Sequence, residues 1–271
     1  MNTTVKDGSR FENDAHRYAG YLETPEGRLR ADLAFANLRD FLPVTAGLRA
    51  LDVGGGTGDA SVRLARLGIH VTLLDSSPAM LELAERTSVE AGVRDKITIK
   101  HGDAARLVDI FDKGPFDVVL CHNVLDFVDD PAAVVRAAVR VMRDSAAVLS
   151  VLVRNQAGEV LKAALKTGDL AAAEHNLTAG WGQESLYAGR VRLFTPDGLE
   201  AILKDASLTI TARRGVRVVA DYLPEQISRS TEYERIFALE RKLGTRGDFF
   251  GVARYMQCLA ACPTSGLEAH G

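Results

Sequence analysis

The stretch that decides the fold is LRALDVGGGTGD, residues 48–59. Residues 48–53 have the apolar character of a strand, and residues 59–67 have the pattern of a helix. Glycine is required between such elements because the turn adopts backbone angles closed to other residues and lets a ligand approach the main chain. A generic tight turn has the same composition, so the turn alone is weak evidence for a ligand site.

Strand and helix patterns alternate outward from this turn for five cycles, with short connections between them. Such alternation predicts a doubly wound, mostly parallel α/β sheet of the Rossmann-like type, with helices on both faces. Two later strand patterns bring the predicted sheet to seven strands. The predicted strands are 48–53, 70–75, 97–101, 116–121, 146–153, 208–219 and 250–260, and the predicted helices are 25–42, 59–67, 77–90, 104–110, 130–142, 196–204 and 232–243.

The flanks and one interruption complete the predicted organisation. Residues 1–45 are expected to form an N-terminal arm, disordered over residues 1–12, and a covering helix. Residues 46–262 form the predicted main domain, and residues 263–271 a flexible tail. A helical insertion at about 154–190, with a helix at 156–170, breaks the rhythm after the fifth strand.

Composition narrows the class of protein. The chain has 271 residues, of which 46% are hydrophobic and 25% charged, as in an ordinary globular protein. Its net charge of −3 does not indicate nucleic-acid binding. No apolar run reaches the roughly 18 residues of a membrane span, and the polar N-terminus has no signal-peptide core, so we expect a cytoplasmic location. Three cysteines without a CxxC pair argue against a zinc ribbon or a disulfide framework.

Polar residues follow the next three predicted strands. Asp75 ends the second strand, 19 residues after Gly56, where a carboxylate can accept hydrogen bonds from both ribose hydroxyls. Residues 102–105 (GDAA) follow the third strand, and His122 follows the fourth. Each has an ordinary alternative, namely a helix cap, a turn residue or a histidine satisfied under a loop. Together, at the carboxyl ends of consecutive strands, they predict a nucleoside site.

The spacing of the glycines separates two nucleoside ligands. A dinucleotide site has the pattern G-x-G-x-x-G, and its helix N-terminus faces a pyrophosphate. Here the spacing is G-x-G-x-G, and Asp59 occupies the third position, where its charge would repel a pyrophosphate. S-adenosylmethionine has no phosphate, and its ammonium group suits a carboxylate such as Asp52. The pattern therefore favours the methyl donor over a nicotinamide cofactor.

With these residues identified, the chain resembles class I S-adenosylmethionine-dependent methyltransferases. Within them it resembles the bacterial tRNA 5-carboxymethoxyuridine methyltransferase family, which esterifies a carboxylate on a wobble uridine. The resemblance extends from about residue 20 to residue 260. The stretches that carry it are LDVGGGTG (51–58), LLDSSPAML (73–81), TPEGRLR (24–30), CHNVLDFV (121–128), GVRVVADYL (215–223), YE (233–234) and ARYM (253–256).

The resemblance implies a role for particular residues. Arg30 would bind the cofactor's carboxylate, Gly55 and Gly56 its methionine part, and Asp75 the ribose, with His122 beside the sulfonium. The full set of expected cofactor contacts, from resemblance and strand-end position together, is Arg30, Asp52, Gly54, Gly55, Gly56, Asp75, Ser76, Asp103, Ala104, Ala105 and His122.

The acceptor site is less sharply marked. An ionised carboxylate acceptor needs a cation to hold it, for which Arg217 is the candidate, with Tyr222 and Arg254 as neighbours. The alternative is that Arg217 lines the solvated face of a strand. If the acceptor were a phenol or an amine, His122 could serve as the base. The predicted catalytic residues are therefore His122, Arg217 and Tyr222.

One departure bears on the partner. The family's insertion is rich in lysine, whereas residues 180–190 here carry one acidic and one basic residue. Affinity for the phosphates of a tRNA anticodon arm comes largely from Lys and Arg contacts. The departure leaves a small-metabolite O- or N-methyltransferase as an alternative. A nicotinamide-dependent oxidoreductase and a silent cofactor-binding domain are further alternatives.

Overall fold

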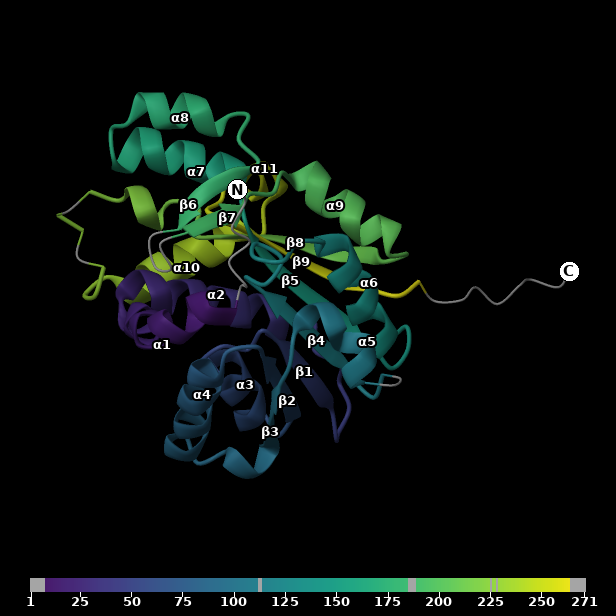
Figure 1. The fold of residues 1–271 in the computed structure, drawn as a ribbon. Coiled ribbons are helices and arrows are strands. Elements are labelled where there is room, and N and C mark those ends of the chain that lie inside the picture. The colour runs from purple at the N-terminus through teal and green to yellow at the C-terminus, as the bar shows by residue number, and fades with distance from the viewer. Residues whose placement is uncertain (1–7, 112–113, 185–188, 225, 228, 264–271) are drawn as a thin grey trace, which may run out of the picture.

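The computed structural model describes residues 8–111, 114–184, 189–224, 226–227 and 229–263 (Figure 1). In that part of the chain, no helix combines the length and the apolar character needed to cross a membrane. The predicted tail at 264–271 and the first seven residues of the predicted arm lie outside the described residues.

A seven-stranded sheet forms the centre of the molecule, in the order β3-β2-β1-β4-β5-β9-β8. Strands β1 to β5 are parallel to one another, and β9 pairs antiparallel with both β5 and β8. This confirms the predicted doubly wound, mostly parallel fold. The strands are β1 (Arg49–Val53), β2 (His70–Asp75), β3 (Ile97–His101), β4 (Val118–His122), β5 (Val148–Arg154), β8 (Thr209–Val216) and β9 (Tyr255–Ala261).

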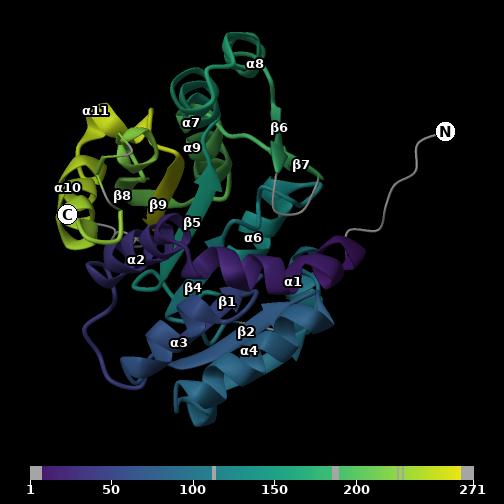
Figure 2. The ribbon, with the colours of Figure 1, turned by 90° about the vertical axis from the view of Figure 1, so that its left-hand side faces the viewer.

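Helices cover both faces of the sheet (Figures 1 and 2). On one face, apolar side chains of α2, α3 and α4 pack on the inner strands, and α10 joins α2 beside β8. On the other face, α5, α6 and α9 bury a second apolar cluster. These helices are α2 (Pro25–Arg39), α3 (Asp59–Arg66), α4 (Pro78–Glu90), α5 (Leu107–Ile110), α6 (Pro131–Val141), α9 (Pro196–Asp205) and α10 (Tyr233–Gly244).

The N-terminal segment contains a helix that the sequence did not predict. Helix α1 (Gly8–Glu23) begins inside the predicted disordered arm, so that prediction is wrong from residue 8 onward. Its Ala15 is buried against Met80 of α4, which explains why the segment is ordered. Gly27 permits the tight junction with α2, because a Cβ there would lie 2.0 Å from the carbonyl oxygen of Tyr21.

The insertion after β5 is helical only in its first part. Helix α7 (Gln156–Leu161) continues into a π-helical turn at Lys162–Lys166, which Asp169 separates from α8 (Leu170–Asn176). A two-stranded antiparallel hairpin, β6 (Trp181–Glu184) and β7 (Gly189–Arg192), follows. The predicted single helix at 156–170 is therefore broken, and the hairpin is a feature that the glycine-containing pattern did not reveal.

Two predicted strands are shorter than expected, for a visible reason. Strand β8 ends at Val216 because Arg217 adopts a left-handed conformation, with φ of 60°, and a 3-10 turn at Ala220–Tyr222 follows. The last strand begins at Tyr255 rather than at residue 250, because a short helix, α11 (Gly247–Phe250), occupies the start of that segment.

The chain that follows β8 is held by one buried carboxylate. Glu240 of α10 accepts hydrogen bonds from three consecutive backbone amides, those of Val218 (2.6 Å), Val219 (2.8 Å) and Ala220 (2.7 Å). The Glu240 side chain is fully buried. It therefore satisfies donors that no strand pairing reaches, and it fixes the segment that carries Arg217.

We predict that Glu240→Ala lowers the free energy of unfolding by about 3 kcal/mol or more, because it leaves three buried N–H groups without an acceptor. Urea denaturation measures this change. The control is Glu234→Ala, which removes an exposed carboxylate from the same helix and is expected to leave stability within about 0.5 kcal/mol of the wild type. Equal stability of the two variants would contradict the assignment.

Candidate functional site

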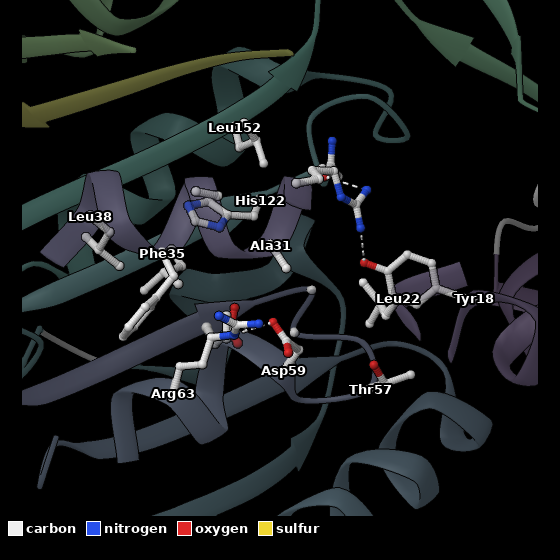
Figure 3. Close-up of a pocket in the computed structure, with 18 residues that line it drawn as sticks. Tyr18, Leu22, Ala31, Phe35, Leu38, Thr57, Asp59, Arg63, His122 and Leu152 are labelled. Carbon is white, nitrogen blue, oxygen red and sulfur yellow. Dashed lines mark hydrogen bonds and ion pairs between the residues drawn. The ribbon is translucent and has the colours of Figure 1, made fainter. Parts of the chain in front are cut away.

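A cavity opens at the carboxyl ends of β1, β4 and β5, beneath helices α1 and α2 (Figure 3). It contains about 620 Å³ of space that is partly open to solvent. This is the edge at which open α/β sheets bind ligands. Five of the predicted cofactor residues line the cavity: Arg30, Asp52, Gly54, Gly55 and His122.

The glycine turn between β1 and α3 forms the floor of the crevice. Gly54, Gly56 and Gly58 have φ values of 63°, 54° and 85°, which residues other than glycine rarely adopt. A Cβ on Gly54 would lie 2.5 Å from a methyl of Val124, and one on Gly55 would lie 2.6 Å from Leu73. Glycine is therefore needed at residues 54 and 55 because Val124 and Leu73 pack directly against the turn.

Asp75 ties the turn to the neighbouring strand. Its Oδ2 accepts a hydrogen bond from the amide of Gly56, and its Oδ1 accepts one from the amide of Ser77, both at 2.9 Å. Burial raises the pKa of the carboxyl although both amides favour its ionised form. Asp75 does not line the cavity but stands beside it, across the turn.

The remaining cofactor residues predicted from the sequence extend the crevice along the ends of β2 and β3. The carbonyl of Ser76 lies 3.0 Å from His101 Nε2, and Asp103 caps the turn of Ala104–Arg106 by accepting from the amide of Ala105 at 2.8 Å. Ser76, Asp103 and Ala105 are exposed. The predicted residues thus lie along a single edge of the sheet, from Arg30 to Ala105.

Asp52 is a buried carboxylate at the base of the cavity. It is 2% exposed, and Ser61 Oγ donates to its Oδ2 at 2.7 Å. Burial raises its pKa to about 7, although the Ser61 hydrogen bond favours the ionised form. A cation at this position would stabilise the charged carboxylate.

His122 is held in a neutral form. Its Nε2 lies 2.8 Å from Ser150 Oγ, to which Gln257 also donates at 3.0 Å. Burial, together with the positive charge of Arg30, lowers the pKa of His122 to about 3. An imidazole with so low a pKa is a poor proton acceptor, so this environment disfavours the role of general base for His122.

Arg30 of α2 connects the cavity with the loop after β4. Its guanidinium donates to Tyr18 Oη at 2.9 Å and to Asn123 Oδ1 at 3.2 Å. Asn123 has a left-handed φ of 55° and donates in turn to Asp126 at 3.2 Å. Asn123 and Arg217 are two of the three non-glycine residues with positive φ in the described chain, and such strain clusters at functional sites.

Four buried arginines surround the ring of Tyr255 at the end of the sheet. The guanidinium carbons of Arg30, Arg154, Arg217 and Arg254 lie 5.7, 5.6, 5.9 and 5.7 Å from its centroid. Burial opposes ionisation of the phenol, but the four cations outweigh it and lower the pKa of Tyr255 to about 7. We call these five residues the arginine cluster.

Three carboxylates face the arginine cluster. Glu159 pairs with Arg154 at 3.2 Å and with Arg254 at 2.5 Å. Asp221 pairs with Arg217 and lies 3.7 Å from Arg254. Asp126 accepts a hydrogen bond from the amide of Arg154 at 2.9 Å; burial raises the pKa of Asp126, and the amide and charge of Arg154 oppose that rise. The four guanidinium groups thus face three carboxylates and a phenol whose pKa is about 7.

Of the predicted acceptor residues, Arg217 belongs to the arginine cluster and Tyr222 lies outside it. Arg217 is 5% exposed and belongs to the arginine cluster, so it does not line a solvated strand face, and its Nη1 donates to Tyr21 Oη at 3.0 Å. Tyr222 lies farther out, on the turn after β8, with its hydroxyl 3.4 Å from the carbonyl of Gly158. Neither is among the residues that line the cavity.

Sequence reasoning missed two members of the arginine cluster, Arg154 and Tyr255. The available signal was a charged residue at the carboxyl end of the apolar β5 pattern, which is the position expected of a ligand-binding side chain. Tyr255 carried no such signal, because its role depends on arginines contributed by four separate segments.

The chain resembles known proteins in sequence and in fold. Residues 51–149 match the methyltransferase domain family. The tRNA 5-carboxymethoxyuridine methyltransferase of Escherichia coli (strain K12) is 29% identical over 267 residues, which cover 94% of this chain and 97% of that protein. The CcbJ methyltransferase of Streptomyces caelestis has the same fold, with a TM-score of 0.65, 16% identity and coverage of 96% and 100% of the two chains.

A further solved structure is that of magnesium protoporphyrin IX methyltransferase from Synechocystis PCC 6803 with bound S-adenosylhomocysteine. It aligns with a TM-score of 0.61 at 16% identity, over 94% of this chain and 98% of that one. The glycine turn, the acidic residue that ends the second strand and these relatives lead to one conclusion. This chain is an S-adenosylmethionine-dependent methyltransferase with the class I fold.

Proposed function

We propose that this methyltransferase esterifies a carboxylate on a modified tRNA nucleoside. The observation that carries the proposal is the arginine cluster, a group of four buried guanidinium groups that reaches the cavity through Arg30. Guanidinium groups bind carboxylates through charge-assisted, often bidentate, hydrogen bonds. The relative from Escherichia coli, which aligns over nearly its whole length, carries the name of such an activity.

The residues of the crevice fit the methyl donor part by part. We assign the ribose to Asp75, the ammonium group to Asp52 and the carboxylate to Arg30, with the methionine chain along Gly54–Gly56. The adenine is assigned to the turn at Asp103–Ala105 and the region beside the sulfonium to His122. The assignment rests on the glycine turn that lines the cavity and on the raised pKa of the buried Asp52, which a bound cation would lower.

Methyl transfer to a carboxylate requires little from the protein beyond alignment of the two reactants. S-adenosylmethionine supplies a methyl carbon made electrophilic by a positive sulfur, which leaves as a neutral thioether. A carboxylate acceptor is already ionised at pH 7, so no residue has to remove a proton. The protein therefore contributes position and exclusion of water. The neutral His122, with its pKa of about 3, agrees with a reaction that needs no base.

The charge of the insertion favours a second candidate, a small-metabolite O- or N-methyltransferase. Residues 180–190 carry one acidic and one basic residue, so this stretch offers little attraction to phosphates. With a small-metabolite acceptor, the arginine cluster would still favour an anionic group.

The acceptor is identified by the fate of a labelled methyl group. Purified enzyme with methyl-labelled S-adenosylmethionine is given bulk bacterial RNA or a small-molecule extract. We expect label in tRNA, and we expect mild alkali to release it as methanol, because an ester hydrolyses where methyl ethers and methylamines do not. Alkali-stable label, or label only in small molecules, would contradict the proposal.

The same assay tests Arg217. Replacing Arg217 by Met is expected to raise the KM for the acceptor by about 10- to 100-fold, because a charge-assisted hydrogen bond is lost. The Kd for S-adenosylmethionine, measured by calorimetry, stays at the wild-type value. Arg217→Lys keeps the charge but loses the planar fork, so its KM for the acceptor is expected to fall between the values of the wild type and of Arg217→Met.

The matched control is Arg213→Met, because Arg213 lies on β8, four residues before Arg217, is exposed and pairs with Glu200. Its acceptor KM is expected to equal that of the wild type. If Arg217→Met and Arg213→Met gave the same KM, Arg217 would have no part in holding the acceptor.

The pKa of Asp52 yields a prediction of opposite effects on stability and binding. Asp52→Asn removes a buried charge, so it raises the free energy of unfolding at pH 8. Because the pKa is about 7 in the folded protein and ~3.9 in the unfolded chain, the wild type loses stability relative to the variant as pH rises between these values. Above pH 7 the extra stability of Asp52→Asn over the wild type no longer changes with pH.

The affinity for S-adenosylmethionine changes the other way, because the variant has no charge to pair with the ammonium group. Denaturation and calorimetry across pH 5 to 8 measure the two quantities, with the exposed Asp95→Asn as control. A variant that is no more stable at pH 8 and binds the cofactor as tightly as the wild type would refute the assignment.

A further inference from the structure

The hairpin after α8 presents an aromatic and cationic face. Trp181 is paired with Arg192, and Gln183 with Arg190, so these four side chains lie on one face of the two strands. The opposite face carries Gly182 and the fully buried Val191. The hairpin is therefore anchored on one side and open to solvent on the other.

Trp181 is held open to solvent between two cations. Its side chain is 38% exposed, and the guanidinium carbons of Arg190 and Arg192 lie 4.8 and 4.5 Å from its ring. Arg192 is steadied by a 3.1 Å hydrogen bond from its Nη2 to the carbonyl of Asp129. An exposed indole with two fixed positive charges matches a base and its phosphates.

The face lies at the rim of the proposed active site. The amide of Arg192 donates to the carbonyl of Asp126 at 2.8 Å. The side chain of Asp126 accepts from Asn123, which lines the cavity beside Arg30. The amide of Phe194, just after the hairpin, donates at 3.0 Å to the carbonyl of Arg154 in the arginine cluster. Figure 2 shows β6 and β7 descending from α8 toward α6.

We propose that this face, formed by Trp181, Arg190 and Arg192, receives the single-stranded RNA around the target nucleoside. Trp181 stacks on an unpaired base, and the two arginines contact the backbone phosphates. Sequence-specific RNA recognition mostly targets loops, whose unstacked bases pack on aromatic rings and guanidinium planes. The inference rests on the proposed function, and it supplies an RNA contact that does not depend on lysines in the insertion.

Trp181 is the single tryptophan of the chain, so its fluorescence reports directly on this face. Titration of the wild type with an anticodon stem-loop RNA is expected to quench the emission, because a stacked base covers the indole. Raising the salt concentration weakens the quenching, and Arg190→Gln with Arg192→Gln reduces that salt dependence. Emission unchanged by saturating RNA would overturn the proposal. A shift that depends on protein concentration without RNA would overturn it too, since a second copy would then cover the face.

Kinetics supply the second readout. Trp181→Ala is expected to raise the KM for tRNA by about 5- to 100-fold with kcat unchanged, and Trp181→Phe by less, because one stacked base is worth about 1–3 kcal/mol. The control is Leu170→Ala, which shortens an exposed apolar side chain of the same insertion. A KM for Trp181→Ala equal to that of the control would refute the proposal. If the wild type methylated no RNA, the proposed function would fail, while the quenching would still decide this inference.

Discussion

The hydrogen bond between Asp75 and the amide of Gly56 is the contact on which the site depends. It fixes the turn after β1 against the end of β2, with three glycines in conformations that other residues rarely adopt. A carboxylate is thereby placed beside the turn. A nucleoside with a cationic sulfur and no phosphate fits such a crevice, whereas Asp59 at the helix start would repel a pyrophosphate.

The arginine cluster is the other defining feature, and packing alone does not explain it. Burying four guanidinium groups and three carboxylates is costly, and such ion clusters stabilise a fold weakly or not at all. Here the cluster is assembled from α2, β5, the turn after β8 and the start of β9, and it is held by Glu240 and the strained Arg217. We interpret this concentration of guanidinium groups beside the cavity as preparation for an anion.

Much of this could be predicted from the sequence because the signals are local. Glycine spacing and alternating apolar strands predicted the inner strands of the sheet almost to the residue, as at His70–Asp75. The strand-end aspartates remain predicted cofactor residues. The misses depend on long-range contacts. The order of α1 comes from Ala15 packing on Met80, and the role of Tyr255 comes from arginines more than a hundred residues apart. The hairpin that carries Trp181 is fixed by the loop after β4, which no local pattern indicates.

The central claim is that Asp75 binds the sugar of the methyl donor beside the turn. Calorimetry of S-adenosylmethionine binding to Asp75→Ala, with the exposed Asp95→Ala as control and circular dichroism to confirm folding, tests it most directly. The account predicts a Kd raised by about 100-fold or more in Asp75→Ala, through lost charge-assisted hydrogen bonds, and an unchanged Kd in the control. A folded Asp75→Ala protein that binds the cofactor as tightly as the wild type would contradict it.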